Sequence, residues 1–351
     1  MEHVDVVVVG AGQAGLATAC ALVRHGLKAV VLEASGQPAG SWPRYYDSLT
    51  LFSPARFSSL PGMPFDRGDP DRYPHRDEVV AYLTAYAAHL DVDIRTGRRV
   101  AAVQEREGGF VVELEDGDRI SARAVVSASG SFGSPYRPAL PGLDDYEGAV
   151  LHASEYRSPE AFRGQRVIVV GAGNTAVQIA VELASVARVT LASRNPVKFA
   201  PNASSAATCT SGSSAQAWTP PPSVAFLRTP PTQPVFDTGR YRAAVDADAP
   251  DRRPLFASIA GKQVAWSDGV KEEVDAIVLA TGYRPDLPYL ADLGVTGGHG
   301  RPLHRDGFSA VHDRLAFVGL ECQRTLSSNS LRGVGRDAER VARRMASGLG
   351  G

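Results

Sequence analysis

The hydrophobic pattern begins with a strand, a helix and a second strand. An apolar run rich in β-branched residues covers 4–9 and is typical of a buried parallel strand. Apolar positions then recur at helical spacing through 16–23, and Gly26 is placed to end that helix. A second apolar run over 28–32 ends at Glu33. We therefore predict a β-α-β unit of about 30 residues.

The same unit returns in the middle of the chain. An apolar run covers 167–170, a helical pattern continues to Ala184, and another apolar run covers 189–192. Repetition of one unit within a chain indicates two similar substructures.

The remaining pattern predicts elements around these two units. An amphipathic helix is expected over 76–90, and alternation within 98–126 predicts a small antiparallel meander with a turn at 115–118. Residues 36–75 and 131–165 are interpreted as ordered loop and linker. Further strands are expected over 125–130, 277–279 and 315–318, and a last helix over 336–346.

Composition and charge narrow the classes of protein. The chain has 351 residues, is 44% hydrophobic and 21% charged, and carries 37 basic against 38 acidic residues. A nearly neutral chain favours neither a nucleic-acid partner nor stable membrane association. Three widely spaced cysteines exclude a disulfide framework, a zinc ribbon and a CxxC redox pair. No apolar stretch reaches about 18 residues, so we expect a cytoplasmic protein.

The first β-α-β unit contains a dinucleotide fingerprint. Gly10, Gly12 and Gly15 form a GxGxxG pattern between the strand and the helix. These glycines permit a tight turn, backbone approach to a pyrophosphate, and close helix–strand packing. Glu33 follows Gly15 by 18 residues, where a carboxylate can accept the hydroxyls of an adenosine ribose.

The second unit carries a related fingerprint with a different end. Gly171 and Gly173 are followed by Ala176 in the third place, and Ser193 and Arg194 stand where the first unit has its acid. A guanidinium suits a 2′-phosphate, which a carboxylate would repel. The pattern favours NADPH here and FAD at the first site, an arrangement that permits hydride exchange between nicotinamide and flavin.

These observations predict an α/β protein with two dinucleotide-binding Rossmann-like domains, each with a small antiparallel β-meander. The FAD-binding domain would comprise 1–145 and 275–351, with the NADPH-binding domain inserted at 146–274.

Between the fingerprints, a linker pattern runs from Tyr146 through Gly148 and His152 to Tyr156-Arg157. With Tyr for the opening Phe, this pattern resembles the signature of the flavin-containing monooxygenase family, the class B flavoprotein monooxygenases. Residues 280–283 and 40–42 resemble its ATG and GGxW motifs. Residues 45–86 are most similar to the plant indole-3-pyruvate monooxygenases and the bacterial arsenic-operon flavin monooxygenases.

The resemblance implies a mechanism and leaves alternatives open. NADPH would reduce FAD, O2 would form a C4a-(hydro)peroxyflavin, and a small soft nucleophile (S, N or As(III)) would take one oxygen. Baeyer–Villiger or 2-oxo-acid oxygenation, and an uncoupled NADPH oxidase or flavin reductase, are alternatives. A thioredoxin-reductase-like enzyme is disfavoured without CxxC, and a non-enzymatic nucleotide sensor would bind FAD without oxidising NADPH. Partners would be O2 and a small-molecule substrate, with a homodimer left open.

The fingerprints and the resemblance together define the expected site. FAD is expected to contact Gly10, Gly12, Gln13, Ala14, Gly15, Glu33, Gly40, Ser41, Trp42, Val100, Ser129, Gly130 and Gly319. NADPH is expected to contact Gly171, Gly173, Asn174, Thr175, Ala176, Ser193, Arg194, Thr281, Gly282 and Tyr283. Because the flavin does the chemistry, no catalytic residue is assigned; Ser53 and Arg332 are candidates beside the flavin, and no metal site is expected.

Several other residues receive structural interpretations. His152 is expected to make hydrogen bonds in the interdomain linker, and Cys20 to pack in the core. His299, His304 and His312 are interpreted as solvated loop residues. The segment 199–227 contains no charged residue and is interpreted as a surface loop, with a mobile element over the substrate site as the alternative.

Overall fold

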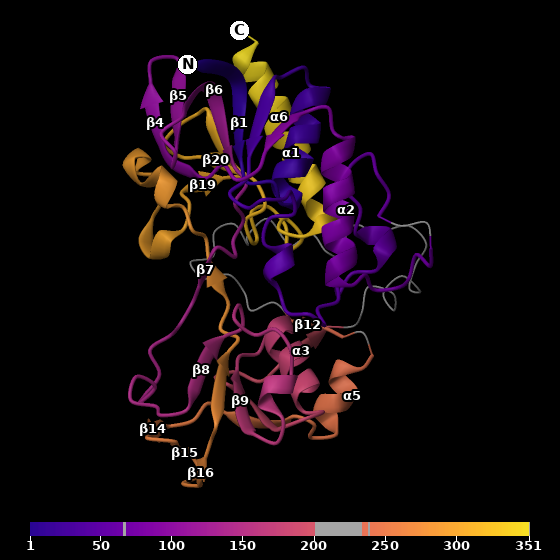
Figure 1. The fold of residues 1–351 in the computed structure, drawn as a ribbon, viewed down its shortest axis with the longest axis vertical. Coiled ribbons are helices and arrows are strands. Elements are labelled where there is room, and N and C mark those ends of the chain that lie inside the picture. The colour runs from indigo at the N-terminus through magenta and orange to yellow at the C-terminus, as the bar shows by residue number, and fades with distance from the viewer. Residues whose placement is uncertain (66–67, 201–233, 238, 351) are drawn as a thin grey trace.

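The fold is described from a computed structural model of the chain. It describes residues 1–65, 68–200, 234–237 and 239–350. The described elements form two bodies, each built around a parallel sheet, which lie one above the other along the long axis (Figure 1). Both ends of the chain lie at the outer end of the first body.

The first sheet contains the buried strands that the hydrophobic pattern predicts. Its strands are β1 (Glu2–Val9), β2 (Ala29–Leu32), β3 (Asp93–Arg95), β4 (Val100–Arg106), β5 (Gly109–Leu114), β6 (Arg119–Ser127), β19 (His304–Arg305), β20 (Phe308–Ser309) and β21 (Leu315–Phe317). The parallel strands follow the order β21-β6-β1-β2-β3, and β4 and β5 continue from β6 as the antiparallel meander. The meander predicted within 98–126 is confirmed.

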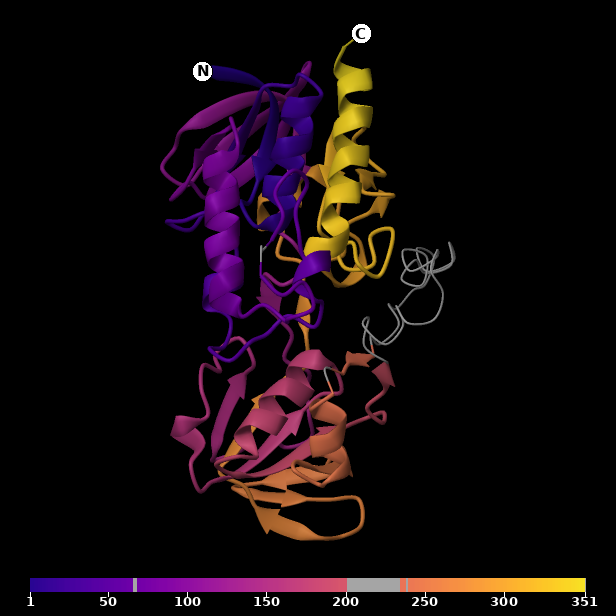
Figure 2. The same ribbon diagram turned by 90° about the vertical axis from the view of Figure 1, so that its right-hand side faces the viewer.

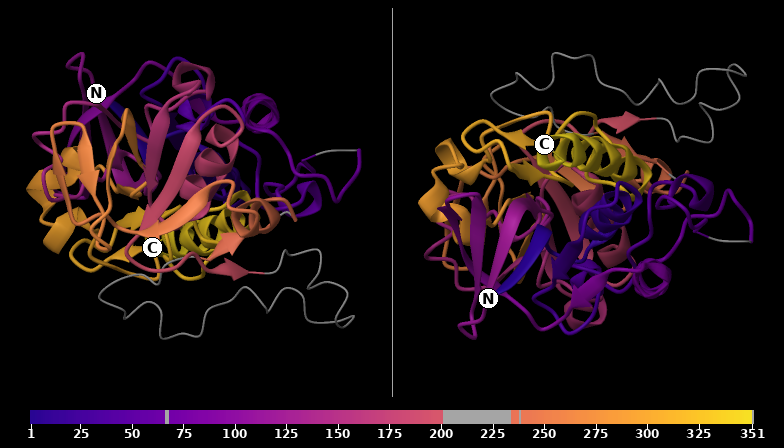
Figure 3. Two further views of the ribbon diagram at one scale, coloured as in Figure 1. Left: turned by 90° about the horizontal axis from the view of Figure 1, so that it is seen from below. Right: turned by 90° about the horizontal axis from the view of Figure 1, so that it is seen from above.

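Three helices cover one face of this sheet. They are α1 (Gln13–Arg24), α2 (Arg76–His89) and α6 (Leu331–Leu349), and their apolar side chains form one core with those of β1 and β2. Figures 2 and 3 show α6 beside α1. The other face of the parallel strands packs against the meander strands β4 and β5 and the short helix η5 (Pro288–Leu293). His75 and Glu78 form a capping box that starts α2.

The second sheet repeats the plan and confirms the predicted fold class. Its parallel strands are β8 (Ala149–His152), β9 (Arg166–Val170), β10 (Arg188–Ser193), β13 (Asp251–Pro254) and β17 (Ala276–Leu279), in the order β13-β10-β9-β17-β8. Helices α3 (Asn174–Leu183) and α5 (Tyr241–Asp246) pack on one face. The antiparallel strands β14 (Ser258–Ala260), β15 (Gln263–Ala265) and β16 (Lys271–Glu273) pack near the other.

The strand β17 corrects one predicted boundary. The predicted FAD-binding domain includes residues from 275 onward, but β17 pairs with β8 and β9 in the second sheet. The boundary therefore falls after Leu279, because backbone pairing with distant strands decides sheet membership. The rest of the domain division stays a prediction.

Two short pairings connect distant parts of the chain. The strands β7 (Ser134–Pro135) and β18 (Tyr283–Arg284) pair antiparallel where the chain passes between the bodies. The strands β11 (Phe199–Ala200) and β12 (Val235–Phe236) pair in parallel. Apart from β11, the charge-free segment 199–227 lies outside the described residues. Short 3-10 turns are η1 (Trp42–Arg44), η2 (Ala55–Phe57), η3 (Glu160–Phe162) and η6 (Gly298–Gly300).

The last helix begins earlier than the expected 336. It starts at Leu331 and includes Gly333 and Gly335, which weaken a helix when judged from sequence alone. A Cβ at Gly333 would lie 2.2 Å from the backbone oxygen of Ser327, and one at Gly335 would lie 2.7 Å from the Pro61 ring. Close packing, not helix propensity, accounts for both glycines.

A partly buried ion pair joins the second meander to its sheet. The Arg166 guanidinium on β9 donates from Nε and Nη2 to the two carboxylate oxygens of Glu272 on β16, each at 2.8 Å. Trp266 Nε1 donates to the same carboxylate at 2.7 Å. Arg166→Ala should lower the free energy of unfolding by about 2 kcal/mol, because the partly buried Glu272 carboxylate loses two charged hydrogen bonds and keeps only the one from Trp266. Urea denaturation measures this.

The matched control is Arg95→Ala, which breaks a surface pair with Glu2 and should cost less than about 1 kcal/mol. Equal losses in the two variants would contradict the prediction. The hydrogen bonds from Arg166 lower the pKa of Glu272. Their contribution is therefore present above the ordinary carboxyl pKa and is lost as pH falls through the lowered value. The stability difference between wild type and Arg166→Ala should shrink in acid.

Candidate active site

One large cavity lies between the two sheets. Its volume is about 2010 Å³, and its wall includes residues that directly follow parallel strands of both sheets. From the first sheet these are Gly10, Glu33 and Ala128, and from the second Ala153, Gly171, Arg194 and Ala280. The carboxyl ends of parallel strands are where α/β sheets bind ligands. The cavity therefore joins the two fingerprints in one space.

The first fingerprint has the backbone geometry that its glycines suggest. Gly10 has a φ of +102°, a left-handed conformation that favours glycine. A Cβ at Gly15 would lie 1.7 Å from the Gly10 oxygen, so α1 contacts the turn directly. A Cβ at Gly40 would lie 2.8 Å from the Gly12 Cα. The two loops that line this end of the cavity therefore approach each other through their backbones.

Glu33 binds the same loop from the end of β2. Its carboxylate accepts the Ala11 amide at 2.7 Å and the Ser35 amide and hydroxyl at 2.8 Å each. The side chain is buried but faces the cavity, and ionised oxygens have lone pairs for further donors. This placement agrees with the predicted ribose contact.

Gln13, at the start of α1, connects three segments. Its Nε2 donates to the Asn329 oxygen at 2.6 Å, and its Oε1 accepts from Trp42 Nε1 at 2.7 Å. The predicted cofactor residues Gln13 and Trp42 are thus in direct contact. Asn329 comes from the loop before α6, which the sequence analysis did not assign to the site.

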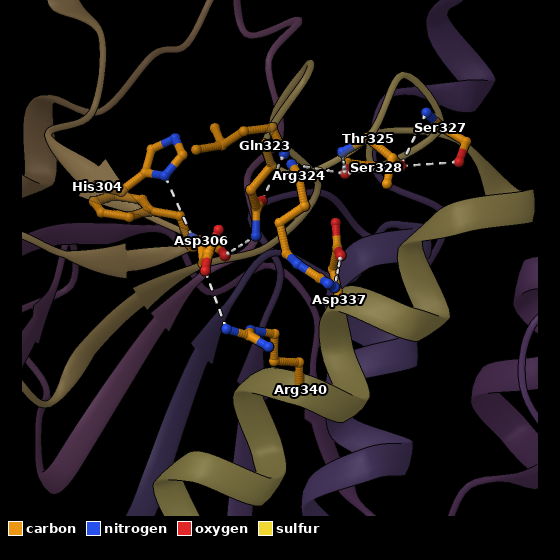
Figure 4. A network of polar contacts seen from close by, with 12 residues as sticks. His304, Asp306, Gln323, Arg324, Thr325, Ser327, Ser328, Asp337 and Arg340 are labelled. Atoms are coloured by element: carbon orange, nitrogen blue, oxygen red, sulfur yellow. Dashed lines mark hydrogen bonds and ion pairs between the residues drawn. The ribbon is translucent and has the colours of Figure 1, made fainter. Parts of the chain in front are cut away.

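A buried carboxylate anchors that loop (Figure 4). Arg324 donates to Asp337 on α6 at 2.8 Å, and Ser328 Oγ accepts the amides of Arg324 and Thr325 at 3.1 and 3.0 Å. Burial raises the pKa of Asp337, which is 2% exposed. The anchored loop supplies Leu326, Ser327, Asn329 and Ser330 to the cavity wall.

The other predicted flavin contacts also lie on the cavity wall. Ser129 Oγ is 3.0 Å from the hydroxyl of Tyr289, a buried residue absent from the prediction. Gly319 approaches α1 so closely that its Cβ would lie 2.6 Å from the Ala14 Cβ. The wall includes Ala14, Gly40, Ser41, Val100, Gly130 and Gly319. Gly15 is the exception, because it packs against Gly10 instead of facing the cavity.

The second fingerprint leaves open space beside its turn. Gly171 has a φ of +152°, and its Cβ would lie 2.4 Å from the Ala280 oxygen. At Gly173 a Cβ would meet nothing within 4 Å. Asn174 Oδ1 accepts the Phe236 amide at 2.9 Å, which ties α3 to β12. Gly173, Asn174, Thr175 and Ala176 all line the cavity.

Basic side chains stand at the end of β10. Ser193 and Arg194, which are expected to contact NADPH, line the cavity, and the Ser193 hydroxyl donates to the Asn195 oxygen at 2.8 Å. Lys198 lines it too, although the sequence analysis did not select it. Its signal was available, since Lys198 is a cation four residues after Arg194. Two cations here suit a nucleotide that carries an additional phosphate.

The residues after β17 form the passage between the bodies. Thr281, Gly282 and Tyr283 line the cavity, and the Thr281 hydroxyl donates to the Tyr136 oxygen at 2.5 Å. The ring of the buried His152 makes a 3.0 Å hydrogen bond to the Gly282 oxygen, which agrees with its expected role in the linker. Burial raises the pKa of Tyr283 to about 12, so its hydroxyl stays protonated at neutral pH.

Ser53 and Arg332, the two candidates expected beside the flavin, both lie on the cavity wall. Ser53 Oγ is 2.9 Å from the buried Ser58 hydroxyl. The Arg332 guanidinium lies 4.5 Å from the Phe57 ring centroid, and burial lowers its pKa. Apolar contact is provided by Phe52 and Phe236, whose rings stack with centroids 4.9 Å apart. No group of three His, Cys, Asp or Glu that could hold a metal occurs among the described residues.

The interpretation of two histidines is wrong. His312 is 12% exposed and hydrogen-bonds the Leu293 oxygen at 2.9 Å, with Glu105 3.1 Å from its other nitrogen. The His304 ring centroid lies 6.1 Å from that of Phe317, and burial lowers its pKa. Distant strands cover both side chains, which local sequence does not reveal. Cys20 packs against the core of the first sheet as expected.

The cavity wall fits the two expected cofactors. The first fingerprint presents a glycine turn, a helix N-terminus and a buried carboxylate, and the second presents an open glycine cradle and two cations. The first set suits an adenine dinucleotide with free ribose hydroxyls, and the second suits one that carries a 2′-phosphate. The assignment of individual residues to each cofactor remains a prediction. No described helix is long and apolar enough to cross a membrane.

Comparisons with known proteins agree with this geometry. A family model described as pyridine nucleotide-disulphide oxidoreductase matches residues 7–209. A CzcO-like oxidoreductase of Geobacillus kaustophilus is 32% identical, over 97% of each chain. The indole-3-pyruvate monooxygenase YUCCA1 of Oryza sativa is also 32% identical, over 96% of this chain and 90% of that protein.

A solved structure extends the likeness to the whole fold. The flavin-containing monooxygenase from Stenotrophomonas maltophilia is 31% identical and superposes with a TM-score of 0.85, covering 99% of this chain and all of that one. The chain therefore belongs to the pyridine nucleotide-disulphide oxidoreductase family and is a flavin-dependent oxidoreductase of the flavin monooxygenase group, with FAD and NADPH as cofactors.

Proposed function

We propose that this protein oxidises NADPH and transfers one oxygen atom from O2 to a small soft nucleophile with a reactive S, N or As(III) atom. The single observation behind the proposal is that one cavity contains both fingerprints. A nicotinamide and a flavin held by the two strand ends would meet in the same space, and a small substrate would enter there as well.

The residues around the cavity would bind, orient and exclude water. A flavin, when bound, supplies hydride acceptance and O2 activation. Glu33 would accept the ribose hydroxyls of one nucleotide, while Arg194 and Lys198 would neutralise the added phosphate of the other. The rings of Phe52 and Phe236 and the side chains of the wall would keep water from the reacting atoms. Tyr283 stays a hydrogen-bond donor at neutral pH.

A second candidate is oxygenation of a 2-oxo acid. The relative from Oryza sativa is an indole-3-pyruvate monooxygenase, and it matches nearly the full chain. Such a substrate would lose its carboxyl group as CO2. A third possibility is an uncoupled enzyme that converts NADPH, a proton and O2 into NADP⁺ and H2O2 without any second substrate.

The test combines NADPH consumption with product analysis. The FAD-loaded protein is mixed with NADPH and 18O2, alone and with a thioether, an amine, As(III) or a 2-oxo acid. Because free H2O2 itself oxidises thioethers and As(III) and decarboxylates 2-oxo acids, each reaction is repeated with catalase present. We expect a soft nucleophile to suppress H2O2 release and to gain one 18O atom even with catalase. CO2 release that persists with catalase, from the 2-oxo acid and with no product from the other compounds, would support the second candidate. Stoichiometric H2O2 with every compound would contradict oxygen transfer.

A further inference from the structure

One short segment contacts both fingerprint helices. Residues 41–47 follow β2 and thus belong by sequence to the first body, yet part of the segment is buried in the core of the second. We call residues 41–47 the connecting segment. Its contacts join the start of α1 to the middle of α3.

At its first end the connecting segment is attached to α1. Trp42 Nε1 donates to Gln13 Oε1 at 2.7 Å. The Ser41 and Tyr45 hydroxyls lie 3.0 Å apart, and the rings of Trp42 and Tyr45 meet edge to face with centroids 5.5 Å apart. Gln13 and Trp42 line the cavity and are expected FAD contacts, so this end of the connecting segment is attached to the FAD side of the site.

At its second end the connecting segment enters the core of the second body. The Tyr46 hydroxyl donates to Gln178 Oε1 on α3, and the two side chains are 4% and 7% exposed. The Tyr46 ring packs with that core, 6.0 Å from the Tyr156 ring. Burial raises the pKa of Tyr46 well above its ordinary value, so the hydroxyl remains a donor.

Further hydrogen bonds fix the path of the backbone between these ends. Arg76 Nη1 donates to the Tyr45 oxygen and to Asp47 Oδ1, both at 2.7 Å. The Asp47 amide donates to the Arg157 oxygen at 2.9 Å, and the Arg157 guanidinium returns to the Tyr45 oxygen at 3.1 Å. The connecting segment therefore has little freedom to change its length or direction.

The spacing of the two helices matters for the reaction. Each fingerprint helix orients its nucleotide through the phosphates, so the distance between α1 and α3 sets the distance between the flavin and the nicotinamide. Hydride transfer depends steeply on this distance, since a misplacement of about 1 Å can cost about 100-fold in rate. NADPH loses a hydride and becomes NADP⁺, and the flavin gains the same hydride.

We propose that the connecting segment holds the two cofactors at hydride-transfer distance, with Tyr46 and Gln178 as its positioning residues. The inference rests on the proposed reduction of the flavin by NADPH. Neither side chain needs to touch a reacting atom for this role. Their hydrogen bond joins the two bodies at the level of the cavity.

The first measurement is anaerobic stopped-flow reduction of the FAD-loaded Tyr46→Phe protein by NADPH. The variant keeps the ring and loses the hydroxyl. We expect the limiting rate constant to fall about tenfold, while the NADPH concentration for half-maximal rate stays within about twofold. The amount of bound FAD should equal that of wild type. The double variant Tyr46→Phe, Gln178→Met should have a flavin reduction rate no lower than that of the slower single variant. Each substitution removes the same hydrogen bond, so the second change has nothing further to remove.

Tyr156→Phe is the matched control. The Tyr156 hydroxyl is also buried in the second core and bonds Glu182 on α3 at 2.7 Å, but it does not reach the first body. We expect NADPH to reduce the flavin of Tyr156→Phe at the wild-type rate. A second readout needs no cofactor: hydrogen exchange in the cofactor-free protein should rise within residues 41–49 in Tyr46→Phe and stay unchanged there in Tyr156→Phe.

The outcomes separate the two proposals. If NADPH fails to reduce the wild-type flavin, the proposed function fails and the positioning role fails with it. If wild type is reduced but Tyr46→Phe matches it in rate and exchange, only the positioning role is overturned. A loss of rate of the same size in Tyr156→Phe would also overturn it, because general weakening of the core would then explain both.

Discussion

Replacing Gly15 with alanine should abolish FAD binding and leave little folded protein. Gly15 lies in the first turn of α1, where a Cβ would be 1.7 Å from the Gly10 oxygen. No rotation of a methyl group relieves this overlap, because both partners are backbone. The helix must move away from β1, which opens the core shared with α6 and displaces the helix N-terminus from the cavity. Flavin absorbance per protein and the thermal midpoint measure the effect.

Gly348→Ala is the matched control for this change. Gly348 is an exposed glycine in the last turn of α6, and its Cβ would meet nothing within 4 Å. The same substitution there should be neutral or should stabilise the protein by up to about 1 kcal/mol. A Gly15→Ala protein with wild-type FAD content and thermal midpoint would contradict the prediction, because α1 could then move away from the Gly10 turn without loss of binding or stability.

The second prediction concerns the choice of nucleotide. Arg194→Ala should raise the KM for NADPH about 10- to 100-fold, which corresponds to the loss of a hydrogen bond between charged groups. The KM for NADH should change less than about twofold, since NADH has no 2′-phosphate. Arg194 follows β10, lines the cavity, and occupies the place that Glu33 has in the first unit. Steady-state kinetics with both nucleotides measures the ratio.

Lys198→Ala tests whether Lys198 binds the 2′-phosphate of NADPH together with Arg194. Lys198 also lines the cavity, so its loss should raise the KM for NADPH by a smaller factor and in the same direction. Parallel increases for NADPH and NADH in Arg194→Ala would show that the arginine binds another part of the nucleotide. Flavin content serves as the check that both variants are intact.

Much of the fold could be predicted from local patterns. The strands at 4–9 and 167–170, the helix after each glycine motif and the meander within 98–126 all occur. Each arises from short-range rules: a buried parallel strand is a continuous apolar run, and a helix follows where a glycine turn frees its first amides. The strand β8 is absent from the prediction because its four residues lie in a proline-rich linker and, within the described part of the chain, pair with β17 alone.

The candidate site divides in the same way. Glu33 and Arg194 were identified because each directly follows a predicted strand, and parallel strands end at one edge of a sheet. Tyr46, Lys198, Asn329 and Asp337 were not assigned to the site. Gln13 and Asn329 are 316 positions apart, and Tyr46 and Gln178 are 132 apart. A pattern within a short stretch of sequence does not predict contacts between residues so far apart.

Local residue patterns therefore specify the two β-α-β units, their glycine turns and the charge at the end of each second strand. These features depend on residues within one unit, where chain connectivity already limits the geometry. Long-range packing instead places β17 in the second sheet, turns the strand ends of both sheets toward one cavity, and brings Tyr46 of the connecting segment into the core of the second body. Those outcomes depend on side-chain packing between segments far apart along the chain, which no short stretch of sequence specifies.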